Sequence, residues 1–116
     1  MERIVELSFA RLRLRAERAG ADYCLLLEGG SAPHIGCAVL ALPRPSLRED
    51  GSRSATASVL NVVGHKDEAV CRLLAERVAA RKNAIVVCTG GFHVDGISRE
   101  QIAELTRAVE ALAEEI

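Results

Sequence analysis

The three histidines of this 116-residue chain are the side chains best suited to proton transfer or metal binding, and each has a glycine nearby. His34, His65 and His93 border apolar runs, so we expect them in glycine-rich loops at the ends of strands. A histidine ring titrates near neutral pH and can donate or accept a proton. For each ring taken alone, a loop histidine bonded to backbone or water is the simpler explanation. The three together favour a ligand pocket, because strand ends are where sheets hold small molecules.

The first histidine belongs to a glycine-rich segment, residues 29–36, that also contains Pro33 and Gly36. Apolar runs flank this segment at residues 23–27 and 37–42. We expect the two runs to pair as a β-hairpin, with the glycine-rich segment as its turn.

The second histidine lies between Gly64 and Lys66, where a strand is expected to give way to a helix. Backbone N–H groups at a helix start, the helix dipole and a lysine ammonium can together bind a phosphate. Acidic residues at positions 67 and 68 oppose an anion there and weaken this prediction.

The third histidine follows Gly91 and precedes Asp95 by two positions. Residues two apart lie on one face of an extended segment, so Asp95 is placed to orient the His93 ring as a base. Both side chains are equally suited to a metal site, and three histidines can hold a zinc ion with an open position. The sequence contains no serine in a nucleophile elbow, and it leaves open whether the protein is an enzyme.

Composition excludes several classes of partner. Fifteen basic and sixteen acidic residues give a net charge of -1, and aromatic residues make up 3% of the chain. We therefore expect neither nucleic acid nor a membrane as a partner. The N-terminal residues lack the pattern of a signal peptide, and the four cysteines are widely spaced. These features predict a single domain over residues 1–116, with reduced thiols and a cytoplasmic location.

Periodicity predicts four strands, a helix, a strand and a helix. The strand near residue 11 alternates strictly, which places Arg11, Arg13 and Arg15 on one face. That face is either solvated or a basic stripe that meets a ligand phosphate or an acidic partner. The expected elements are strands at 11–17, 23–27, 35–42 and 55–63, a helix from about 68 that ends at Asn83, a strand at 84–89 covered on both faces, and a helix capped by Ser98 and Gln101.

This element order predicts an α+β fold, with an antiparallel sheet that carries both helices on one face. The other sheet face holds small and mixed side chains and needs a cover. The simplest cover is a second copy of the chain, so we expect a homodimer that forms through the sheet.

At the three histidine loops the sequence resembles the LpdD-like prenylated flavin chaperones, a family of small proteins of gallate and hydroxyarylic acid decarboxylase systems. The resemblance extends over about residues 11–114. The motifs are short, but their order and spacing make the resemblance more specific than any one motif would be. The motifs lie at residues 29–36, 61–68 and 86–97.

The resemblance implies a cytoplasmic chaperone that binds prenylated FMN, or FMN, between a flavin prenyltransferase and a UbiD-type decarboxylase. It also implies assistance in oxidising the cofactor to its iminium form, and the dimerising fold of the small proteasome assembly chaperones. By motif, the ligand contacts would fall on His34, His65, Lys66 and His93. On this hypothesis Lys66 holds the phosphate, and His34 and His93 lie near the ring system. Two alternatives remain: a metal-dependent small enzyme that uses the three histidines, and an assembly chaperone with no ligand.

Overall fold

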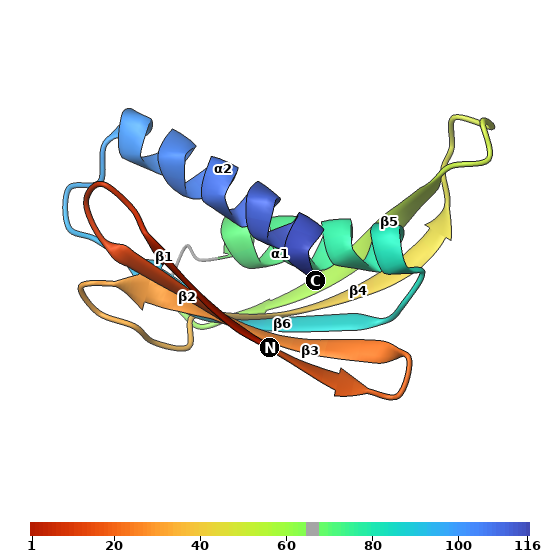
Figure 1. Ribbon diagram of the computed structural model, residues 1–116, viewed down its shortest axis with the longest axis horizontal. Helices are drawn as coiled ribbons and strands as arrows, with labels where there is room; N and C mark the ends of the chain where they lie inside the picture. Colours follow the sequence, from red (N-terminus) through yellow and green to blue (C-terminus); the bar gives the residue numbers. More distant parts are fainter. Residues whose placement is uncertain (65–67) are drawn as a thin grey trace.

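A computed structural model describes residues 1–64 and 68–116 of the chain. It shows one six-stranded sheet with two helices on the same face, which confirms the α+β class (Figure 1). The elements in chain order are β1 (Glu2–Glu6), β2 (Arg11–Ala19), β3 (Asp22–Gly30), β4 (Cys37–Pro45), β5 (Arg53–Asn61), α1 (Glu68–Lys82), β6 (Val86–His93) and α2 (Arg99–Glu115).

The sheet is mixed, so the prediction of a purely antiparallel sheet is wrong. The strand order is β1-β2-β3-β6-β4-β5, and β6 runs parallel to β3 and antiparallel to β4. The expected hairpin of β3 with β4 is therefore also wrong, because β6 lies between them. The connection from β3 to β4 instead passes around the end of β6. Ser31 N–H donates to the His93 carbonyl and Gly36 N–H donates to the Gly90 carbonyl, both at 2.8 Å.

Five strands precede the first helix, one more than expected. The additional strand, β1, pairs with β2 over its whole length. A tight turn joins the two strands, with the Leu7 N–H donating to the Ala10 carbonyl at 2.8 Å. The change of apolar parity between Leu7 and Arg11 therefore marks a turn between strands rather than a bend within one.

The core lies between the sheet and the helices and is built as the alternation in β2 predicts. Leu12 and Leu14 are fully buried, while Arg11, Arg13 and Arg15, which alternate with them, point to the opposite face. The buried aliphatic side chains on the helix side come from β3, β4, β6, α1 and α2. Prominent among them are Leu25, Leu27, Val39, Val86, Leu74, Val78, Val109 and Leu112. In the described part of the chain neither helix is long and apolar enough to cross a membrane.

Local sequence signals determine where α1 ends and where α2 begins. Asn83 has a φ of 52°, the left-handed conformation expected after α1. At the start of α2, Ser98 Oγ accepts from the Gln101 backbone N–H at 3.1 Å, and Gln101 Oε1 accepts from the Ser98 N–H at 2.9 Å. The predicted capping box is confirmed.

The sheet face opposite the helices, which we call the uncovered face, carries exposed apolar side chains. Val87 in the central strand β6 is 37% exposed, so the expectation that both faces of this strand are covered is wrong within one chain. Its register neighbour Leu40 and the nearby Leu60 are 41% and 77% exposed. The uncovered face is thus apolar over β6, β4 and β5.

Candidate functional site

A cavity of about 480 Å³ opens where β6 ends and both helices begin. Its volume is in the usual range for pockets that bind small molecules. We call it the histidine cavity. Its lining residues are His34, Gly64, Ala69, Val70, Phe92, His93, Val94, Ile97, Ile102 and Leu105.

His34 comes to the cavity from the connection between β3 and β4. Its Nδ1 lies 2.8 Å from the Ala32 carbonyl oxygen. Because a carbonyl oxygen only accepts, Nδ1 carries the proton and Nε2 is the acceptor atom of the neutral ring. The ring packs directly on Gly91, where an added Cβ would lie 2.5 Å from Nε2 and 2.7 Å from Cε1. Glycine at position 91 therefore leaves the space that the imidazole occupies.

His93 ends β6 and has the opposite hydrogen-bonding pattern. Its Nε2 lies 2.8 Å from Asp95 Oδ1, so Nε2 donates to the carboxylate and Nδ1 is the acceptor of the neutral ring. The Asp95 side chain is 97% exposed, so the pair contributes little to stability. What the contact does is fix which nitrogen of the ring holds the proton.

The rest of the cavity wall is apolar. Val94 and Ile97 belong to the loop that leaves β6, and the other aliphatic side chains come from the first turns of α1 and α2. From the sequence, Ile97 and Ile102 are expected to form a capping staple, and Ile102 and Leu105 to belong to the core stripe. One feature of the sequence could have indicated that these apolar residues line a cavity. They lie where helices begin, next to the loops that carry histidines.

The structure brings part of the predicted site together. His34, His93 and Gly64 line the histidine cavity, and Gly91 and Asp95 contact the two rings. His65 and Lys66 lie outside the described residues.

Two predicted site residues lie elsewhere. Gly36 is buried in backbone pairing, because its N–H donates to Gly90 and its carbonyl accepts from the Val62 N–H at 2.9 Å. Pro33 lines a different hollow of about 260 Å³, which we call the arginine hollow. Its other lining residues are Glu2, Ile4, Arg11, Arg13, Glu28, Gly29 and Gly30.

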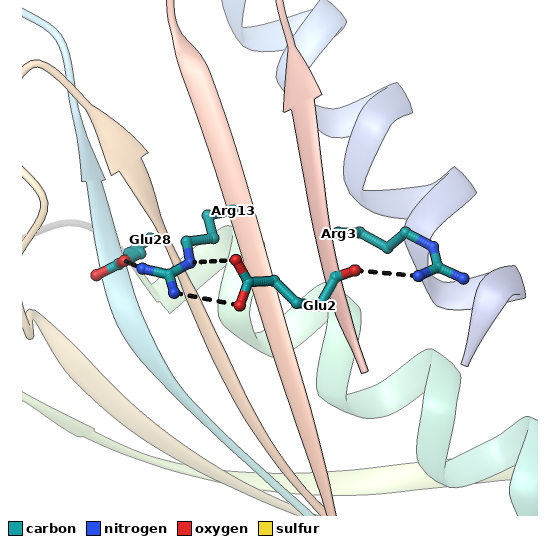
Figure 2. A network of polar contacts seen from close by, with 4 residues as sticks. All are labelled: Glu2, Arg3, Arg13 and Glu28. Atoms are coloured by element: carbon teal, nitrogen blue, oxygen red, sulfur yellow. Dashed lines mark hydrogen bonds and ion pairs between the residues drawn. The ribbon is translucent and has the colours of Figure 1, made fainter.

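Both arginines of this hollow are paired with carboxylates, and Figure 2 shows the contacts of Arg13. Arg13 contacts both carboxylate oxygens of Glu2 at 3.2 Å, and its other terminal nitrogen contacts Glu28 at 3.3 Å. Arg11 contacts Glu6 at 2.6 Å. The hydrogen bonds from Arg13 lower the pKa of the Glu2 carboxyl below its ordinary value. These pairings favour a neutralised, solvated face over a basic stripe that binds phosphate.

A metal site finds no support in the described part of the chain. There, no group of three or more histidine, cysteine, aspartate or glutamate side chains is arranged to hold an ion.

A concave, mostly apolar cavity with a few polar groups is the kind of place in which proteins commonly bind small molecules. The family described as the prenylated flavin chaperone LpdD-like domain matches residues 8–116, and this chain belongs to that family. A search of curated proteins found no match.

The fold is similar to that of a chain in a chaperone complex for yeast 20S proteasome assembly, with a TM-score of 0.52. The match covers 99% of this chain and 94% of that chain at 14% sequence identity. At this identity the likeness concerns the fold alone, and it agrees with the expected architecture of the small proteasome assembly chaperones.

Proposed function

We propose that this protein binds prenylated FMN and holds it for a UbiD-type decarboxylase. The observation that carries the proposal is the division of the histidine cavity into a polar and an aliphatic part. The two imidazoles, His34 and His93, supply hydrogen-bonding atoms, and the remaining wall is largely aliphatic. Prenylated FMN has the same two parts, a polar flavin ring system and an added hydrocarbon ring. Family membership supports the same ligand.

In this proposal the described site residues have roles that follow from their contacts, and His65 and Lys66 keep the role that the sequence suggests. His34 and His93 lie beside the ring system, with Gly91 making room for the first and Asp95 setting the proton position of the second. Lys66 and His65, next to Gly64, would bind the phosphate at the start of α1. Gly36 and Pro33 shape the connection that carries His34.

The finer proposal is that the protein also assists the oxidative maturation of the cofactor by dioxygen. The cofactor supplies the redox chemistry when it is bound. This chain would supply a proton acceptor, for which the Nδ1 atom of His93 is suited because Nε2 is already bonded to Asp95.

Reconstitution tests the ligand. The protein is mixed anaerobically with reduced prenylated FMN or with reduced FMN and passed through a gel-filtration column, and the visible spectrum of the protein peak is recorded. We expect prenylated FMN to elute in the protein peak. A smaller fraction of FMN should elute with the protein. A protein peak without flavin would contradict the proposal.

We also propose that two copies associate through the uncovered face, as a cover for Leu40, Leu60 and Val87. Sedimentation equilibrium should give twice the mass of the chain, and Leu40→Asp should return it to the monomer mass. A monomeric wild-type protein at high micromolar concentration would contradict this proposal.

We place the protein in the cytoplasm, where thiols such as the buried Cys88 stay reduced.

A further inference from the structure

Both phenylalanines of the chain meet at the histidine cavity. Phe92 lines the cavity, and Phe9 comes from the turn between β1 and β2. Their ring centroids are 6.0 Å apart and their planes are inclined by 76°, an edge-to-face contact. The fully buried side chains of the core are aliphatic or cysteine, so an aromatic pair beside the cavity is a local feature.

The strand beneath Phe92 is shaped for its ring. A Cβ on Gly29 would lie 3.0 Å from Phe92 Cδ2 and 2.2 Å from the Arg11 carbonyl oxygen. The bare backbone at Gly29 therefore allows the Phe92 ring to lie on β3. The Phe92 ring is thus restrained by β3 and by its edge-to-face contact with Phe9.

The turn that carries Phe9 is in turn bound to α2. The Ser8 N–H donates to Glu104 Oε2 at 2.6 Å, and the Ser8 hydroxyl donates to Glu104 Oε1 at 2.5 Å. Glu104 is the neighbour of Leu105 on the helix, and Leu105 lines the cavity. One carboxylate thus links the turn to the same helix that forms part of the cavity wall.

We infer that Phe92 is the surface against which the flat ring system of the ligand stacks, and that residues 7–10 position it. Phe9 acts through its edge contact, and Ser8 acts through Glu104, so these are positioning residues. A side chain that is already fixed loses less conformational entropy when a ligand binds, which strengthens stacking. This inference deepens the proposed function and depends on it.

The test measures flavin affinity and geometry together. FMN and prenylated FMN are titrated into wild type, Phe92→Leu, Phe9→Leu and Glu104→Gln, with Glu100→Gln as the matched exposed control on α2. Kd is obtained from flavin fluorescence, and the visible circular dichroism of the bound flavin reports ring geometry. Melting temperatures show whether each variant folds.

We expect Phe92→Leu to weaken binding about tenfold or more, as for the loss of a stacked ring, and to reduce the circular dichroism signal. Phe9→Leu and Glu104→Gln should weaken binding about threefold and alter the signal, because Phe92 is then less restrained. Glu100→Gln should change neither. Glu104→Gln keeps the test decisive if Phe9→Leu fails to fold, since Glu104 contacts an exposed turn.

Two outcomes separate this inference from the proposed function. A wild-type protein that binds neither flavin would overturn both. A wild-type protein that binds flavin, with Phe92→Leu showing the same Kd and the same circular dichroism, would overturn the stacking inference alone.

Discussion

The histidine cavity and the arginine hollow show two ways in which a sheet end can hold polar side chains. In the arginine hollow, Arg13 is bonded to the opposite charges of Glu2 and Glu28, and its donors are used within the protein. In the histidine cavity, His34 Nδ1 is bonded to the Ala32 carbonyl and His93 Nε2 to Asp95, and the cavity wall beside the rings is largely aliphatic. Charged side chains alone therefore do not indicate a binding site, because they can be neutralised by neighbouring residues of the protein. A concave apolar wall with polar groups of fixed orientation is the better candidate.

The largest expected effect comes from breaking the strand that carries the histidine cavity. Gly90 has a φ of 136°, and an added Cβ would lie 1.8 Å from the Leu27 carbonyl oxygen. We expect Gly90→Ala to lower the free energy of unfolding by about 4 kcal/mol or more, because strain and a backbone clash combine. Urea denaturation measures the loss.

Gly20→Ala is the matched control. Gly20 has a φ of 63° but nothing within 4 Å of its added Cβ, so its loss should be about 1–2 kcal/mol. Equal losses at the two positions would show that the backbone at Gly90 does not have the conformation described.

A smaller effect, on flavin affinity, should distinguish the histidine cavity from the arginine hollow. Gly91→Ala should displace the His34 ring and weaken flavin binding about tenfold while the protein remains folded. Arg13→Ala should leave the flavin Kd unchanged, because the arginine hollow is not the proposed site. Fluorescence titration of both variants checks this. If Arg13→Ala weakened binding and Gly91→Ala did not, the ligand would have to bind in the arginine hollow.

The smallest expected effect is the pH dependence of the arginine hollow. Arg13 lowers the pKa of Glu2 in the folded state, so this pair stabilises the protein above the ordinary pKa of 4.5. The stabilisation is lost as the pH falls through the lowered pKa. The melting temperature of Glu2→Gln should lie slightly below that of wild type at pH 7, and the gap should close as the pH falls toward 3. A gap that widened in acid would contradict the pairing.

Local features of the fold could be predicted from the sequence, but strand neighbours could not. The alternation around Leu12 and the box of Ser98 and Gln101 depend on nearby residues, and both appear as expected. Pairing depends on distant segments. Periodicity shows which face of a strand is buried but not which strand lies beside it, so the insertion of β6 between β3 and β4 gave no local signal.

The same limit applies to the site. Glycine and histidine spacing indicated the loops that carry His34 and His93, which do reach one cavity. The contacts of Phe9 with Phe92 and of Ser8 with Glu104 join residues far apart in the chain. No periodic pattern connects such residues, so these contacts could not be predicted from the sequence.

Flavin binding in the histidine cavity is tested most directly by a titration of prenylated FMN into wild type, the double variant His34→Ala/His93→Ala, and Arg13→Ala. We expect a stoichiometric complex for wild type and Arg13→Ala, and binding about 100-fold weaker for the double variant, because two hydrogen bonds are lost. Equal affinity of wild type and the double variant would contradict the claim that the histidine cavity holds the flavin.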